Sequence, residues 1–207
     1  NPANNSAFTD WLAKPAGSSF VELECQFVGL MAETLFGYNA VILAEPKFAN
    51  CLRQSKIKQQ FLINTSKGGD LQSRLDKLPI ASDSVDLVYM AHSLEYCPNP
   101  QDALAEAYRI LRADGHLLVS MFNPLHIGNK WHNIHWKANF ASLLQLKDWL
   151  ALLGFDTIRV NHFGYYLPFK MAYVVEASKT IIPMTPIKPV WSAETEVIND
   201  DLTEPTT

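Results

Sequence analysis

The segment that most constrains the fold of this chain lies between residues 78 and 124, where two apolar runs flank a well-marked helix. Residues 85–91 and 116–122 have the length and composition of strands that are buried on both faces. Between them, Asn99 can cap a helix, Pro100 suits the first helical position, and Gly115 ends the apolar pattern. A strand, a helix and a strand in tandem predict two parallel strands joined by a helical crossover, which is the unit of α/β folds.

The rest of the chain repeats this alternation of short apolar runs and helical patterns. Further strands are predicted at residues 39–44, 60–64, 156–162 and 171–177. A helix over 19–36 is expected behind the capping-box pair Ser19 and Glu22, and another over 143–153 ends at Gly154. The pattern predicts an open, mostly parallel sheet with helices on both faces and ligands at the carboxyl ends of its strands.

The two ends of the chain differ in composition from the region between them. Residues 1–17 are polar and contain Pro and Gly, so they are interpreted as an irregular lead-in. Residues 180–207 are rich in Pro and then acidic, which is typical of an extended tail. A single domain is therefore expected over residues 1–179.

Composition excludes several classes of protein. The net charge of −4 and the pI of about 5.8 argue against a general nucleic-acid binder. No apolar run reaches the roughly 18 residues of a membrane span, and no signal segment is recognised, so a cytoplasmic protein is expected. Cys25, Cys51 and Cys97 are odd in number and far apart, which predicts three reduced thiols and neither a disulfide nor a zinc site.

Four segments carry a resemblance to a known family. Residues 83–88 (DSVDLV) and 92–96 (HSLEY) are similar to the entry and exit of the fourth strand of class I S-adenosylmethionine (SAM)-dependent methyltransferases. Residues 99–115 and 143–160 resemble the helix that follows this strand and the late helix with its Gly-Phe turn. Phe122-Asn123-Pro124 and the loop 162–168 are similar to a group of small bacterial methyltransferase-like proteins. The resemblance implies a Rossmann-like three-layer sandwich whose seven-stranded sheet has the order 3-2-1-4-5-7-6, with strand 7 antiparallel.

The resemblance also implies a cofactor site, by position. It assigns contacts with SAM to residues that follow the first, second and fourth strands: Glu45, Asn64, Arg74, Leu75 and His92. The chain departs from the family here, since no glycine lies between residues 38 and 67. Asn64 stands where an acidic residue binds the ribose, and Arg74 where one reads the adenine amine, with Asp76 nearby. Three altered contacts at about 1–3 kcal/mol each predict that SAM binding is weak, rebuilt from other residues, or lost.

The candidates for chemistry follow the fourth and fifth strands. His92 is a possible general base for an oxygen or nitrogen nucleophile, and the alternative is a hydrogen-bonded structural residue. Asn123 is a candidate substrate contact, and the alternative is a plain turn. The histidines and tryptophans of residues 123–142 favour an aromatic lid over a metal site, because His132 and His135 have no evident third and fourth ligand.

These observations lead to one functional hypothesis and two alternatives. The leading hypothesis is a SAM-dependent methyltransferase that acts on a small-molecule acceptor. The first alternative is a non-catalytic relative that keeps the fold as a binding or interaction module. The second is a site for another nucleotide-like ligand, with Arg74 at a phosphate. The sequence leaves the acceptor and the oligomeric state open.

Overall fold

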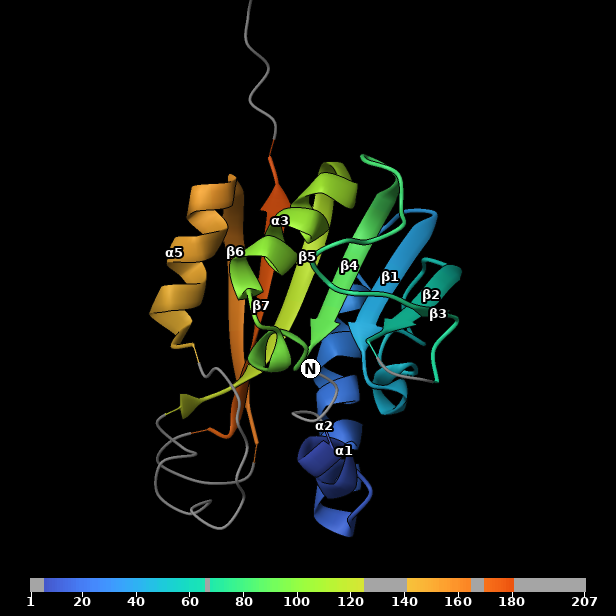
Figure 1. The fold of residues 1–207 in the computed structure, drawn as a ribbon, viewed down its shortest axis with the longest axis vertical. Helices are drawn as coiled ribbons and strands as arrows, with labels where there is room; N and C mark the ends of the chain where they lie inside the picture. The colour runs from blue at the N-terminus through green and yellow to red at the C-terminus, as the bar shows by residue number, and fades with distance from the viewer. Residues whose placement is uncertain (1–5, 66–67, 125–140, 165–169, 181–207) are drawn as a thin grey trace, which may run out of the picture.

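The structure is a computed structural model that describes residues 6–65, 68–124, 141–164 and 170–180, and its centre is one seven-stranded sheet (Figure 1). The strands are β1 (Asn39–Ala44), β2 (Gln59–Asn64), β3 (Leu71–Gln72), β4 (Val85–Ala91), β5 (Leu111–Phe122), β6 (Phe155–Phe163) and β7 (Ala172–Lys179). Their order is β3-β2-β1-β4-β5-β7-β6, and β7 runs antiparallel to both β5 and β6. The predicted fold class and strand order are therefore confirmed.

Helices cover both faces of the sheet. They are α1 (Ser6–Leu12), α2 (Pro15–Ala32), α3 (Pro100–Ile110) and α5 (Leu143–Leu153), with short 3-10 turns η2 (Pro46–Phe48) and η3 (Leu94–Tyr96). α3 and α5 lie on the near face in Figure 1, α2 lies on the far face, and α1 lies beside α2 beyond the lower ends of β1 and β4. Within the described residues, the β1–β2 and β2–β3 connections contain no α-helix, so this side of the near face carries no helical cover.

The central strands separate the core into two layers by simple alternation. In β4, Leu87, Tyr89 and Ala91 face the layer beneath α1 and α2, whereas Val88 and Met90 face the layer beneath α3 and α5. All five are at most 2% exposed. Burial on both faces explains why β4 reads as an unbroken apolar run in the sequence.

The N-terminal region differs from the prediction. α2 begins at Pro15, which occupies the first turn, and the capping-box pair at Ser19 and Glu22 lies inside the helix. The expected lead-in contains α1, whose Phe8, Trp11 and Leu12 are buried. Their i, i+3, i+4 spacing was the signal for a helix, and it is only one turn long.

The α3–β5 junction also lies elsewhere than predicted. α3 ends at Ile110 and β5 begins at Leu111, so Gly115 belongs to the strand and not to a helix terminus. Val85 pairs with Leu111, but Leu87 pairs with His116, so two steps along β4 match five along β5. The extra residues form an irregularity in which Asp114 adopts a positive φ of 60°.

Candidate functional site

A cavity of about 490 Å³ lies at the carboxyl ends of β1, β2 and β4. Ligands of open α/β sheets bind at this edge, and the volume is in the range of small-molecule sites. The cavity is lined by Phe8, Ala44, Glu45, Ile63, Asn64, Thr65, Gln72, Arg74, Leu75, Asp76, Ala91, His92, Ser93, Tyr96, Cys97, Pro98 and Asn99. The structure thus brings together all five residues that the sequence assigns by position to cofactor contacts: Glu45, Asn64, Arg74, Leu75 and His92.

The exit of β1 shows how the chain replaces a glycine-rich turn. Glu45 precedes η2, Pro46 opens it, and the Phe48 N–H donates to the carbonyl of Glu45 at 3.0 Å. Phe48 is fully buried in the core, where its ring lies 6.4 Å from that of Phe8, and it is not part of the cavity wall. The Phe48 side chain therefore lies outside the space that a ligand would occupy, whereas Glu45 lines that space.

The exits of β2 and β3 place amide and ionic groups side by side. Asn64 is 3% exposed and pairs in register with Gln72. Arg74 donates from Nε to Asp76 Oδ1 at 2.9 Å and from Nη2 to Oδ2, and this hydrogen bonding lowers the pKa of Asp76. The Arg74 side chain is 76% exposed, but that of Asp76 is 18% exposed. A carboxylate therefore lies in the cavity wall next to the arginine, two positions later than the family pattern has it.

His92 is the most constrained group of the cavity. It follows β4 with a positive φ of 51°, and its side chain has no exposed surface. Nε2 lies 3.1 Å from Glu24 Oε2, and Nδ1 lies 3.1 Å from Glu95 Oε1. Burial by itself lowers the pKa of His92, but the two carboxylates outweigh it and raise the pKa to about 10. The two carboxyl groups therefore favour the doubly protonated form of the ring at pH 7.

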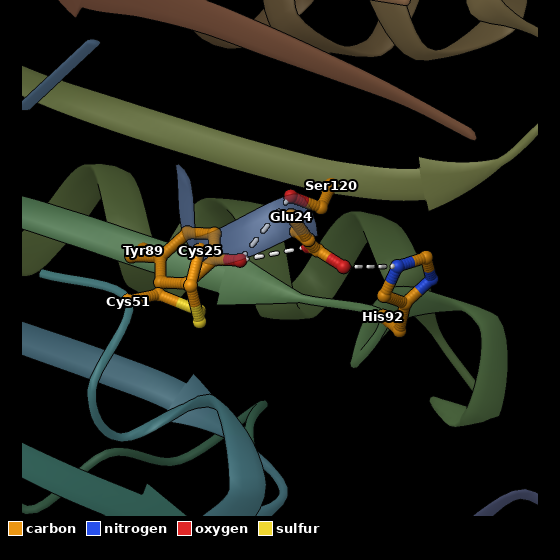
Figure 2. The surroundings of a disulfide bond; sticks show 6 residues. All are labelled: Glu24, Cys25, Cys51, Tyr89, His92 and Ser120. Atoms are coloured by element: carbon orange, nitrogen blue, oxygen red, sulfur yellow. Dashed lines mark hydrogen bonds and ion pairs between the residues drawn. A yellow bond between two sulfur atoms is a disulfide. The ribbon is translucent and has the colours of Figure 1, made fainter. Parts of the chain in front are cut away.

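Glu24 is a buried partner of His92 that sequence reasoning missed. It comes from α2, is fully buried, and accepts from Tyr89 Oη at 2.7 Å through Oε1, while Ser120 Oγ donates to Tyr89 at 3.4 Å (Figure 2). The available signal was its place on the apolar stripe of α2, between Phe20 and Val28. A carboxylate on a buried stripe requires a buried partner, and His92 with Tyr89 supplies it.

The prediction of three reduced thiols is wrong in this structure. Cys25 and Cys51 form a disulfide with a sequence separation of 26, which ties α2 to the turns that follow η2 (Figure 2). Cys97 is buried, and its Sγ donates to the carbonyl of Asn99 at 3.4 Å. Sequence spacing could not reveal the bond, because the fold and not a local motif brings α2 against the β1–β2 connection.

Two aromatic side chains of α1, Phe8 and Trp11, cover the end of β4 and are called the aromatic roof. The Phe8 ring lies 5.8 Å from the His92 ring and 5.1 Å from the Tyr96 ring, and Trp11 packs edge-on against Phe122 at 6.1 Å. Phe8 is 1% exposed. The roof closes the cavity over His92 on the side of α1.

Asn123 lies outside the cavity lining. Its N–H donates to the carbonyl of Met171 at 2.9 Å, and its Nδ2 donates to the carbonyl of Lys170 at 3.2 Å. These bonds join the end of β5 to the start of β7. The histidine- and tryptophan-rich loop, including His132 and His135, lies outside the described residues.

The cavity chemistry suits a polar, nucleoside-like ligand. Ser93 Oγ and Tyr96 Oη are buried in its wall and have no hydrogen-bond partner among the described residues. Buried polar groups without a partner are rare in folded proteins. The apolar parts, which include Ile63, Leu75 and Pro98, suit a flat ring. The residues present therefore fit the cofactor that the sequence resemblance implies.

Within the part of the chain that the structure describes, no group of three or more His, Cys, Asp or Glu side chains could hold a metal ion. No helix in the described part of the chain has the length and apolar character needed to cross a membrane.

The fold and the strand order are those of class I SAM-dependent methyltransferases. A family model described as "Methyltransferase domain" matches residues 27–119 of the 207 in this chain. Solved structures support the fold: a SAM-dependent methyltransferase from Aquifex aeolicus has a TM-score of 0.63 at 15% identity, covering 83% of this chain and 96% of its own. One from Thermotoga maritima has a TM-score of 0.62 at 22% identity, covering 77% and 89%.

Curated relatives match shorter segments. The Escherichia coli K12 protein YafS is 32% identical over 114 residues, which cover 51% of this chain and 47% of that protein. A malonyl-[acyl-carrier protein] O-methyltransferase from Laribacter hongkongensis is 40% identical over 50 residues, covering 24% and 17%. The matched segments thus span less than half the length of both relatives. The [4+2]-cyclase SpnF also has this fold, with a TM-score of 0.62 at 14% identity over 76% of this chain and 81% of its own.

Proposed function

We propose that the chain binds SAM in the cavity at the ends of β1, β2 and β4 and transfers its methyl group to a small-molecule acceptor. The observation that carries the proposal is that residues separated by up to 47 positions, from Glu45 to His92, line one cavity. When bound, SAM supplies an electrophilic methyl group, so the protein contributes mainly position and charge.

Six polar side chains of the wall have a role in this proposal. The Glu45 carboxylate holds the ammonium group of the methionine half, and Asn64 accepts from a ribose hydroxyl. Asp76 accepts from the adenine amine in place of Arg74, which holds the Asp76 carboxylate in position. Ser93 and Tyr96 bring hydroxyl groups that otherwise lack partners.

The acceptor is proposed from the chemistry of the cavity, because the relatives are named for different methyl acceptors. The Laribacter hongkongensis relative is named an O-methyltransferase, and a rice relative, 26% identical over 102 residues, is named a 2-methyl-6-phytyl-1,4-hydroquinone methyltransferase. The aromatic roof of Phe8 and Trp11 favours an acceptor with an apolar part. Because His92 is held as an imidazolium, we infer that it has a structural role in the cavity wall. The acceptor's proton then leaves to another group or to water.

The second candidate is a binding module without methyl transfer, and the closed roof over His92 favours it. Calorimetric titration of the purified chain with SAM and with S-adenosylhomocysteine shows whether either ligand binds. Binding is required by both the methyltransferase and the binding-module proposals. Asn64→Leu should weaken SAM binding at least tenfold, and Glu22→Gln, at an exposed position of α2, is the matched control. No heat and no thermal shift at millimolar SAM would remove the cofactor proposal, since any ligand of the folded state raises its stability. Binding without transfer to any of a panel of phenol, carboxylate and amine acceptors would favour the binding module.

A further inference from the structure

The groups beneath the cavity form a buried cluster with an unbalanced charge. Glu24, His92 and Glu95 have no exposed side-chain surface, and the imidazole lies between the two carboxylates at 3.1 Å on each side. Each ring nitrogen faces a carboxyl oxygen, and these two contacts raise the pKa of His92. Two carboxyl groups therefore face one ring that can hold a single positive charge. Among the described residues, no Lys or Arg forms an ion pair with either glutamate.

Glu95 is the member of this cluster that has a carboxyl oxygen without a hydrogen-bond partner in the described chain. Its Oε1 accepts from the Phe122 N–H at 2.6 Å and from His92, but its Oε2 is buried with no hydrogen-bond partner in the described chain. A buried carboxylate oxygen of this kind is costly unless a cation or a donor approaches it.

The cluster lies against the cavity. His92 lines the cavity, and so do Ser93 and Tyr96, the residues on either side of the Leu94-Glu95 pair. The buried hydroxyls of Ser93 and Tyr96 lack partners as well. A negative charge in a water-poor setting acts strongly over several ångströms. A ligand with a positive charge at this end of the cavity would therefore gain over a neutral ligand of the same shape.

We propose that the Glu24–His92–Glu95 cluster is a fixed negative charge that selects the sulfonium form of the cofactor over its neutral thioether product. The inference rests on the proposed SAM site and deepens it. SAM and S-adenosylhomocysteine differ by one methyl group and one positive charge at sulfur, so the pair isolates the effect of the charge. The cluster would favour exchange of spent for fresh cofactor.

The test compares dissociation constants for SAM and S-adenosylhomocysteine by calorimetry at pH 6, where an imidazole with one remaining carboxylate partner stays protonated. In the unaltered protein, SAM should bind about tenfold more tightly than S-adenosylhomocysteine. Glu95→Gln removes the charge and keeps the shape, and it should reduce this preference to within about twofold by weakening SAM alone. Glu22→Gln, on the exposed face of α2, should leave the preference unchanged.

The outcomes separate this inference from the proposed function. If both ligands bind and the thioether binds as tightly as SAM, or if Glu95→Gln leaves the ratio unchanged, the cluster does not select charge and the site remains. If neither binds, the site and the inference both fail. If Glu95→Gln does not fold, Glu24→Gln removes the other carboxylate and takes its place in the test. The comparison of SAM with S-adenosylhomocysteine in the unaltered protein tests the charge selectivity without any variant.

Discussion

The strongest prediction concerns pH and stability, because His92 has a pKa of about 10 in the folded chain. In the unfolded chain its pKa should be near the ordinary 6.5. The folded state binds the proton more tightly, so the stabilising contribution is complete below pH 6.5 and is lost as pH rises toward 10. The linkage slope is about 1.4 kcal/mol per pH unit, and the whole range corresponds to about 5 kcal/mol. His92 is fully buried, so solvent does not screen this contribution.

Urea unfolding of the purified chain at pH 6.5, 7.5, 8.5 and 9.5 measures this slope directly. Glu24→Gln removes one of the two carboxylates and should lower the free energy of unfolding by about 3 kcal/mol at pH 7. Because it also lowers the pKa of His92, the decline of stability should end at a lower pH in this variant. Glu22→Gln should follow the unaltered protein at every pH. Identical pH dependence in the unaltered protein and in Glu24→Gln would refute the assignment of a buried imidazolium.

Three further predictions follow from other features. Asp76→Asn should weaken SAM binding about tenfold, whereas Arg74→Ala should change it less than threefold; calorimetry that gives the opposite order would assign the contact to Arg74. Gly17→Ala should destabilise the chain by about 2 kcal/mol in urea unfolding, because a Cβ there would lie 2.3 Å from the Trp11 carbonyl oxygen. Unchanged stability would show that α1 moves freely relative to α2. The double change Cys25→Ser and Cys51→Ser should cost about 3 kcal/mol through loop entropy of the unfolded chain, and equal stability of the oxidised and reduced forms would contradict it.

The sequence was most informative where burial on both faces makes strands conspicuous. β1 and β4 were predicted at their observed bounds, as was α5, which Ser142 caps and Gly154 ends with a positive φ of 90°. The start of α2 was not, because the pair Ser19 and Glu22 satisfies a capping pattern inside a helix that Pro15 had already begun. Local patterns do not report what precedes them.

For the candidate site, too, some features could be predicted from the sequence and others could not. The family resemblance placed Glu45, Asn64, Arg74, Leu75 and His92 at the cofactor site, and all five line the cavity. The partners of these residues could not be assigned, since Glu24 lies 68 positions from His92 and the disulfide joins positions 26 apart. Contacts of this kind depend on how α2 packs on the sheet, which is a tertiary property. Site roles for His92 and Asn123 remain predictions.

The buried charge cluster also limits how this chain can change. Four segments meet in it, since Glu24 belongs to α2, His92 follows β4, Glu95 lies in η3, and the Phe122 N–H belongs to β5. Replacing any one member by an apolar residue leaves the others charged and unpaired, but replacing all of them together removes the cost. Related sequences should therefore carry either the complete set or none of it. A redesigned core would have to exchange the three side chains as one unit.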